Sequence, residues 1–380
     1  MNRAGHRFDR YGADNFSLVR RLGDSLSPKN LGFLAGLTLF YFVGGRLGLM
    51  LAFVHPYVTP IWVPSGIALA AFILYGYGVW PAVLMGCFLD HATRSGLVFN
   101  TFSIPVASVL EGFAGAYLVK RYANGAKAFE TAKGVFLFVL FAAVCAPLIN
   151  PTIGVFFDYS RGMIHPADVP FRWLTWWLAH GMGNLLIAPF LIMLFRGSHH
   201  AMDGSEMREL SALLIGLIFV SLLVFGPLAG SLNKDQIVQA WLCIPFLIWA
   251  GFCFCQLEAA GTTLILFGSA IWGTLHGYGS FMAKNLITSL VLLDTFIGVI
   301  GTMTLVVAAM VVERRRIEGE LLATHSLLRE AVDRKERDLV VTVRALEVEV
   351  TGHVQTKKAL RDSQERFRQL ADNAKLDDER

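Results

Sequence analysis

Charged residues are scarce in the amino-acid sequence. Asp, Glu, Lys and Arg form 16% of its 380 residues, whereas soluble domains average about 25%. They are also unevenly distributed, because only 23 of them lie in the long segment 31–312, whereas 30 lie in the short segment 313–380. With 54% hydrophobic residues, this composition excludes an ordinary soluble protein and predicts a membrane domain in the middle. The net charge is only +4, so we expect no nucleic-acid partner.

Reactive cysteines and catalytic motifs are also lacking. All five cysteines lie within apolar runs, where a free thiol usually behaves as a small buried hydrophobic group. The polar segments contain no glycine-rich nucleotide loop, no paired-carboxylate metal motif and no nucleophile elbow. We therefore predict no catalytic residues, no metal site and no cofactor in these 380 residues.

Apolar runs predict about ten membrane spans, with eight as the lower count. A span needs about 20 mainly apolar residues, and seven runs reach that length, at 31–54, 98–119, 134–156, 173–195, 209–228, 238–256 and 286–312. Three shorter runs, at 61–76, 79–91 and 261–276, are interpreted as tilted or re-entrant segments. The expected fold class is all-α, a polytopic membrane helical bundle.

Basic residues in the loops predict the orientation of this bundle. With the N-terminus in the cytoplasm, the cytoplasmic loops receive twelve Lys and Arg residues and the outer loops receive five. Cytoplasmic loops are enriched in Lys and Arg. An even number of spans then returns the chain to the cytoplasm at the basic segment 313–316. We expect both termini in the cytoplasm.

Three ionisable residues lie deep within the predicted spans, namely Arg46, Glu111 and Asp294. Such residues mark either a functional path or a structural clamp, because a charge in hydrocarbon costs several kcal/mol unless it is paired. Arg46 and Glu111 both lie mid-span, so we expect them to be buried and hypothesise that they form an ion pair. Asp294 has no cation near it in the sequence, and we name it as a candidate for a sensor pocket.

Two segments near the predicted outer face interrupt the helical pattern, residues 60–66 and residues 272–281. Non-helical backbone at membrane depth is tolerated where it is buried in protein or lines a wet cavity. Both segments combine aromatic residues with turn residues, so interfacial anchoring is an equally good interpretation. Further candidates for a polar sensor site are Trp62, Pro64, His180 and Asn184.

The C-terminal segment 313–370 has the pattern of a cytoplasmic coiled-coil helix. Apolar residues recur at heptad spacing, and the seam consists of Leu328, Val332, Leu339, Leu346, Leu360 and Phe367. The complementary heptad positions are mostly polar, so the predicted coiled coil is weak. A parallel homodimer is the simplest way to bury this seam. If the last span and this segment form one helix, a small shift or rotation of that helix can carry a signal.

Several motifs resemble those of a known family. They are Tyr41 to Gly48, Thr59 to Ala70, Trp80-Pro81, Glu111, Trp176-Trp177, Leu185 to Pro189, Trp272 to Thr274 and Val312 to Arg316. On these motifs, residues 31–312 resemble the first of the MASE families, the bacterial membrane-associated sensor domains of histidine kinases and diguanylate cyclases. The resemblance implies a location in the bacterial inner membrane. This chain departs from the family at Ala179-His180, where members commonly have Gly-Asp.

The last stretch, residues 359–374, resembles the linker and opening helix of a PAS domain, and only six residues follow it. We expect either a chain cut at that point or a naturally short protein. The predicted organisation is a basic N-terminal segment (1–30), a membrane sensor domain (31–312), a signalling helix (313–370) and a truncated PAS start or tail (371–380).

These features predict the membrane-embedded sensory module of a bacterial signal-transduction protein. It would relay a stimulus through its last span to a dimeric cytoplasmic helix. One alternative is a transporter or channel subunit, because transporters also contain broken helices and intramembrane charges. Another is a sensor that docks beside a transporter. The expected partners are the lipid bilayer, a second copy of the chain, and either a small-molecule ligand or another membrane protein.

Overall fold

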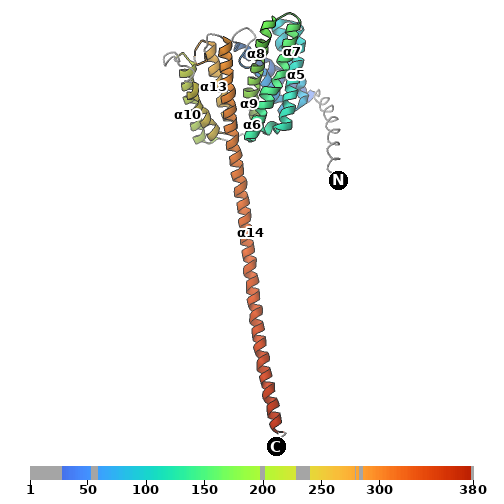
Figure 1. The fold of residues 1–380 in the computed structure, drawn as a ribbon, viewed down its shortest axis with the longest axis vertical. Helices are drawn as coiled ribbons and strands as arrows, with labels where there is room; N and C mark the ends of the chain where they lie inside the picture. The colour runs from blue at the N-terminus through green and yellow to red at the C-terminus, as the bar shows by residue number, and fades with distance from the viewer. Residues whose placement is uncertain are drawn as a thin grey trace. The chain divides into compact units, whose positions relative to one another are not determined.

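The computed structural model describes residues 28–52, 59–196, 202–227, 240–278, 280–281 and 286–377. All regular structure in these residues is helical, and none of them belongs to a strand. The chain divides into two units, residues 1–314 and residues 315–380 (Figure 1). The all-α fold predicted from the sequence is confirmed.

The helices of the first unit fall into two halves. The N-terminal half contains α2 (Pro28–Met50), α3 (Val63–Tyr75), α4 (Trp80–Ser95), α5 (Asn100–Tyr122), α6 (Ala132–Phe138), α7 (Ile149–Ser160), α8 (Val169–Met182) and α9 (Ala188–Phe195). The C-terminal half contains α10 (Gly204–Phe225), α12 (Ile244–Cys253), α13 (Gln256–Leu275) and the start of α14 (Leu286–Asp377). Helix α13 joins the halves because it packs on both α9 and α10.

Two segments of the N-terminal half are interrupted by π-helical turns. The turn η3 (Val139–Cys145) lies between α6 and α7, and the turn η6 (Gly183–Ile187) lies between α8 and α9. The two turns contact each other. A π-helical turn inside an α-helix is rare and is frequently found at a functional site.

The predicted spans coincide with helical segments. Six helical stretches are long and apolar enough to cross a membrane, and Val63–Tyr75 and Trp241–Cys253 are shorter apolar helices. Each of the ten predicted runs overlaps a helical stretch within the described residues. A multi-pass membrane bundle is therefore confirmed, while the number of spans and the cytoplasmic location of the termini remain predictions.

The segment 60–66 begins as extended backbone and becomes helical at Val63. Pro64 occupies the first turn of α3, where a missing backbone N–H costs nothing. The backbone N–H of Trp62 donates to the carbonyl of Ala179 at 2.8 Å. The non-helical backbone is thus buried in protein and hydrogen-bonded, as the sequence predicts for such a segment at membrane depth.

Glycine allows α3 to touch the π-helical turn η6. A Cβ added to Gly183 would lie 2.0 Å from the carbonyl oxygen of Trp62, and one added to Gly66 would lie 2.3 Å from the carbonyl oxygen of Gly183. No side chain fits between these two backbones. This close approach fixes α8 and η6 against the start of α3.

Helix α14 continues without interruption from Leu286 to Asp377. Every side chain described from residue 314 to residue 368 is exposed, including those of the predicted seam, such as Leu339 and Leu346. The helical nature of the signalling segment is confirmed. The coiled coil and the homodimer remain predictions.

Candidate functional site

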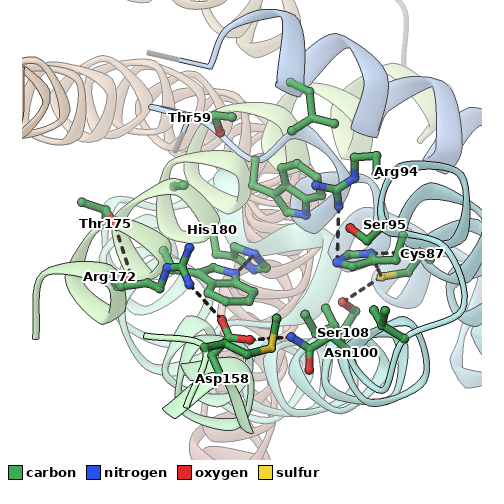
Figure 2. A pocket seen from close by; sticks show the side chains of 18 residues that line it. Thr59, Cys87, Arg94, Ser95, Asn100, Ser108, Asp158, Arg172, Thr175 and His180 are labelled. Carbon is green, nitrogen blue, oxygen red and sulfur yellow. Dashed lines mark hydrogen bonds and ion pairs between the residues drawn. The ribbon is translucent and has the colours of Figure 1, made fainter. Parts of the chain in front are cut away.

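A cavity of about 440 Å³ opens in the N-terminal half, where α4, α5, α7 and α8 meet the segment before α3 (Figure 2). Its polar lining includes Thr59, Cys87, His91, Arg94, Ser95, Asn100, Ser108, Asp158, Arg172, Thr175 and His180. Trp62 and Trp176 contribute aromatic surface. The volume is in the range of small-molecule binding sites. In the predicted topology, this end of the bundle faces the outside of the cell.

His180, which lines this cavity, belongs to a buried pair. Glu111 of α5 and His180 of α8 are each 4% exposed, and His180 Nδ1 lies 2.8 Å from Glu111 Oε2. The indole N–H of Trp176 donates to His180 Nε2 at 2.8 Å. Because an indole nitrogen is only a donor, Nε2 carries no proton. His180 is therefore a neutral imidazole that donates from Nδ1 to Glu111.

Asn184 connects this pair to the π-helical turns. Its side-chain nitrogen donates to the carbonyl of Ala142 in η3 at 2.8 Å and lies 3.5 Å from Glu111 Oε1. Asn184 itself belongs to η6. The two irregular turns thus contact each other beside the buried carboxylate. The sequence pattern did not indicate the π-helical turns, although Asn184, a candidate from the sequence, lies in one of them.

The hypothesised ion pair between Arg46 and Glu111 is wrong. Arg46 Nε lies 3.8 Å from Asp90 Oδ1 of α4, and its guanidinium also donates to the Thr93 hydroxyl. The burial expected for Arg46 is wrong as well, because its side chain is 37% exposed. Helix α2 packs closely on α4, so Arg46 of α2 lies beside the carboxylate of Asp90 in α4.

Asp90 is shared by two arginines. Arg94 Nη2 lies 2.8 Å from Asp90 Oδ2, and Arg46 approaches the other oxygen. His91, beside them, is 3.3 Å from Arg94 through Nε2 and 3.1 Å from the carbonyl of Cys87 through Nδ1. Since a carbonyl only accepts and a guanidinium only donates, His91 is neutral with its proton on Nδ1.

A second polar cluster lies across the cavity. Arg172 of α8 pairs with Asp158 of α7 at 3.2 Å, and the side-chain amide of Asn100 donates to the same carboxylate. Figure 2 shows Arg94 on one side of the cavity and this cluster on the other. The sequence reasoning missed these three residues. Their position at the ends of consecutive apolar runs was the available signal.

The remaining candidates divide between this cavity and other places. Trp62 lines the cavity, whereas Pro64 is buried at the start of α3. Asp294 is buried as expected, at 1% exposed, but it is not among the residues that line the cavity. Within the part of the chain that the structure describes, neither of its carboxylate oxygens has a hydrogen-bond partner.

Metal binding has no support in the described segments, where no three His, Cys, Asp or Glu side chains are grouped to hold an ion. The arrangement of the cavity is instead that of a binding site, with guanidinium groups on two walls and a buried imidazole between them. The hydrogen bond from Trp176 links the lining of the cavity to the buried pair.

Comparison with known proteins places this bundle in a family. The MASE1 family model matches residues 33–315. A probable diguanylate cyclase, DgcE, of Escherichia coli strain K12 is 26% identical over 243 residues, which cover 61% of this chain and 20% of that protein. The chain thus matches about a fifth of the length of this relative. No solved structure gives a significant match. The chain belongs to the MASE1 family, the membrane sensor domains of signalling proteins.

Proposed function

We propose that the cavity receives the stimulus and that α14 relays it to an output domain that follows this segment in a complete signalling protein. The single observation that carries this proposal is the helix α14, which begins inside the membrane bundle and runs unbroken to Asp377. A helix shared by a bundle and a following segment transmits small shifts or rotations.

Contacts within the bundle support a route from the cavity to α14. A Cβ added to Gly298 of α14 would lie 3.4 Å from Met182, which follows His180 by two residues. A Cβ added to Gly301 would lie 3.4 Å from Leu186 and 3.9 Å from Leu185, both in η6. The residues next to the buried pair therefore pack on the backbone of the signalling helix.

The relative supports an output of the diguanylate cyclase type, because it is a probable diguanylate cyclase and the match covers only part of its length. A histidine kinase output remains the alternative. In either case the output acts in the cytoplasm, so we propose an inner-membrane protein with both termini on the cytoplasmic side. The homodimer would form through the seam of α14.

A change of helical phase tests the relay. Residues 1–370 are fused to a diguanylate cyclase catalytic domain, and alanines are inserted after Arg329. Four inserted residues rotate everything beyond them relative to the heptad seam, whereas seven restore the phase. We expect the four-residue insertion to change cyclic di-GMP production several-fold and the seven-residue insertion to leave it nearly unchanged. Equal output from both insertions would contradict the relay.

Paired substitutions test the dimer. Leu339→Ser with Leu346→Ser removes two seam residues seven positions apart. The control is Val341→Ser with Val348→Ser, which are also seven apart and are 67% and 74% exposed. Cysteine crosslinking and mass in detergent should show loss of the dimer in the seam variant only. A monomeric unmodified chain would overturn the proposed dimer.

A further inference from the structure

The charged side chains in the lining of the cavity are already paired. In the described segments they are Arg94, Asp158 and Arg172. Arg94 lies 2.8 Å from the carboxylate of Asp90, and Arg172 lies 3.2 Å from that of Asp158. Burying a charge without a partner is costly. A charged ligand would therefore have to compete with one of these ion pairs.

The charges directly behind the lining are engaged as well. Arg46 approaches the second oxygen of Asp90, and Glu111 accepts a hydrogen bond from the neutral His180. His91 is neutral too, because its ring nitrogens face a carbonyl and a guanidinium. The charges described at this site are thus three arginines and three carboxylates. They favour neither a cation nor an anion.

Asn100 offers a hydrogen-bond acceptor in the lining. Its side-chain amide donates to Asp158, as Figure 2 shows. Among the described residues, its buried carbonyl oxygen Oδ1 has no hydrogen-bond partner. A buried acceptor without a donor is unfavourable, so an O–H or N–H group of a ligand is favoured here. An uncharged donor satisfies Oδ1 without disturbing the ion pair of Asp158.

Aromatic and apolar side chains form another part of the lining. The ring of Trp62 stacks on the imidazole of His180, with 6.2 Å between centroids and 16° between planes. Trp176, Ile104 and Met163 add further apolar surface. Flat aromatic surfaces suit a ring, and the volume of about 440 Å³ is in the range of sites for small organic molecules.

We propose that the cavity binds a small uncharged organic molecule with a ring-containing apolar body and an O–H or N–H donor. The body lies against Trp62 and Trp176, and the donor bonds to Asn100 Oδ1. Phenols, aryl alcohols and indoles have this chemistry. This inference rests on the proposed function of the cavity and names the class of its stimulus.

Binding by the full chain in detergent tests the inference without any output domain. The uncharged probes are phenethyl alcohol, para-ethylphenol and indole, each paired with the O-methyl or N-methyl form that lacks the donor. Phenylacetate, phenethylamine and phenylalanine are the anion, the cation and the zwitterion of similar size. Calorimetry should detect at least one uncharged donor and binding about fivefold weaker for its methylated form, the usual effect of losing one hydrogen bond. The charged probes should give no response.

Filling the cavity locates the site. Val98 lines the cavity and is 42% exposed, whereas its neighbour Leu97 is 74% exposed and is not part of the lining. Val98→Trp should weaken binding of the uncharged donor by about tenfold or more, because the added indole takes the space of the ligand. Leu97→Trp is the matched control and should bind as the unmodified chain does.

A second variant tests the hydrogen bond. Asn100→Leu removes the acceptor, while Asp158 keeps its ion pair with Arg172. The donor and its methylated form should then bind equally well. Their ratio is compared between the variant and the unmodified chain, so that partition of each probe into the micelles cancels.

Each of four results would overturn the inference. They are a panel in which no uncharged donor binds, a charged probe that binds as tightly as the uncharged ones, a Val98→Trp variant with unchanged affinity, and a preference for the donor that persists in Asn100→Leu. Failure here would leave the insertion experiment on α14 unaffected, so the relay and the class of ligand are tested separately.

Discussion

Two buried carboxylates in the same bundle have opposite surroundings. Glu111 accepts a hydrogen bond from His180, which lines the cavity, and lies near Asn184. Asp294 is equally buried, yet no described residue bonds to its carboxylate oxygens. Both are costly in a membrane. The difference shows that the burial of an intramembrane carboxylate does not by itself determine whether it has hydrogen-bond partners.

The helix packing also contrasts glycines that touch a neighbouring backbone with glycines that face open space. The N-terminal half brings backbones together at Gly66 and Gly183 and contains both described π-helical turns. The C-terminal half has one equally close approach, because a Cβ added to Gly273 would lie 2.0 Å from the carbonyl oxygen of Phe225, and it adds aromatic contacts among Phe225, Phe281 and Phe296. The two halves therefore differ in their π-helical turns, while glycines at a few positions set the helix packing in both. The following substitutions test this contrast.

The largest effect is expected from Gly183→Ala. A Cβ at this position would meet the backbone of Trp62 at 2.0 Å, and overpacking of this kind costs about 3 kcal/mol. Gly268→Ala in α13 is the matched control, because nothing lies within 4 Å of its added Cβ, and alanine favours a helix by up to about 1 kcal/mol. Thermal unfolding in detergent should show a lower melting temperature for Gly183→Ala only. Similar values for the two variants would remove the contrast in packing.

Glu111→Leu should cost about 2 kcal/mol in the free energy of unfolding, because it leaves the Nδ1–H of His180 buried without an acceptor. Glu111→Gln should cost less, since an amide oxygen still accepts. Removing both partners, as in Glu111→Leu with His180→Leu, should recover part of the loss. Denaturant unfolding in micelles measures all three, and a double variant less stable than Glu111→Leu would argue against the pair.

Asp294→Leu should raise the free energy of unfolding by about 1 kcal/mol, because it removes a buried polar group and no described contact is lost. Asp294→Asn serves as the control that keeps the shape and a polar group. The same denaturant experiment reports the change. A loss of stability in Asp294→Leu as large as that of Glu111→Leu would show that the two carboxylates are alike.

Arg46→Gln should have the smallest effect, below about 0.5 kcal/mol. Its side chain is 37% exposed and 3.8 Å from Asp90, and partly solvated ion pairs contribute little. Arg94→Gln, which removes the closer and less exposed partner of the same carboxylate, should cost more. Equal melting temperatures for the two variants would mean that the two arginines contribute equally to stability.

Much of the fold could be predicted from the sequence, because hydropathy compares each segment with lipid and needs no knowledge of its neighbours. The overlap of the ten predicted runs with helical segments follows from this, as does the burial of Glu111 and Asp294. The predicted ion pair between Arg46 and Glu111 was wrong because hydropathy does not show which helices are neighbours. Depth in the membrane is a local property, whereas the identity of a partner depends on which helix lies alongside.

The cavity shows the same limit. Trp62, His180 and Asn184 were candidates from the sequence, but the partners Trp176, Asp158 and Arg172 became visible only in three dimensions. Their meeting depends on how α7 and α8 are rotated and on the π-helical turns, which the sequence pattern did not indicate.

By itself, the sequence determined that the chain is a helical membrane protein with a long polar helix after its last apolar segment. It also determined which few polar residues lie within the apolar segments. Only the tertiary structure decided how those residues pair, that Glu111 accepts from a neutral His180, and that two arginines share the carboxylate of Asp90. The physical reason is that hydrogen bonds and ion pairs act over a few ångströms, so helix packing decides them.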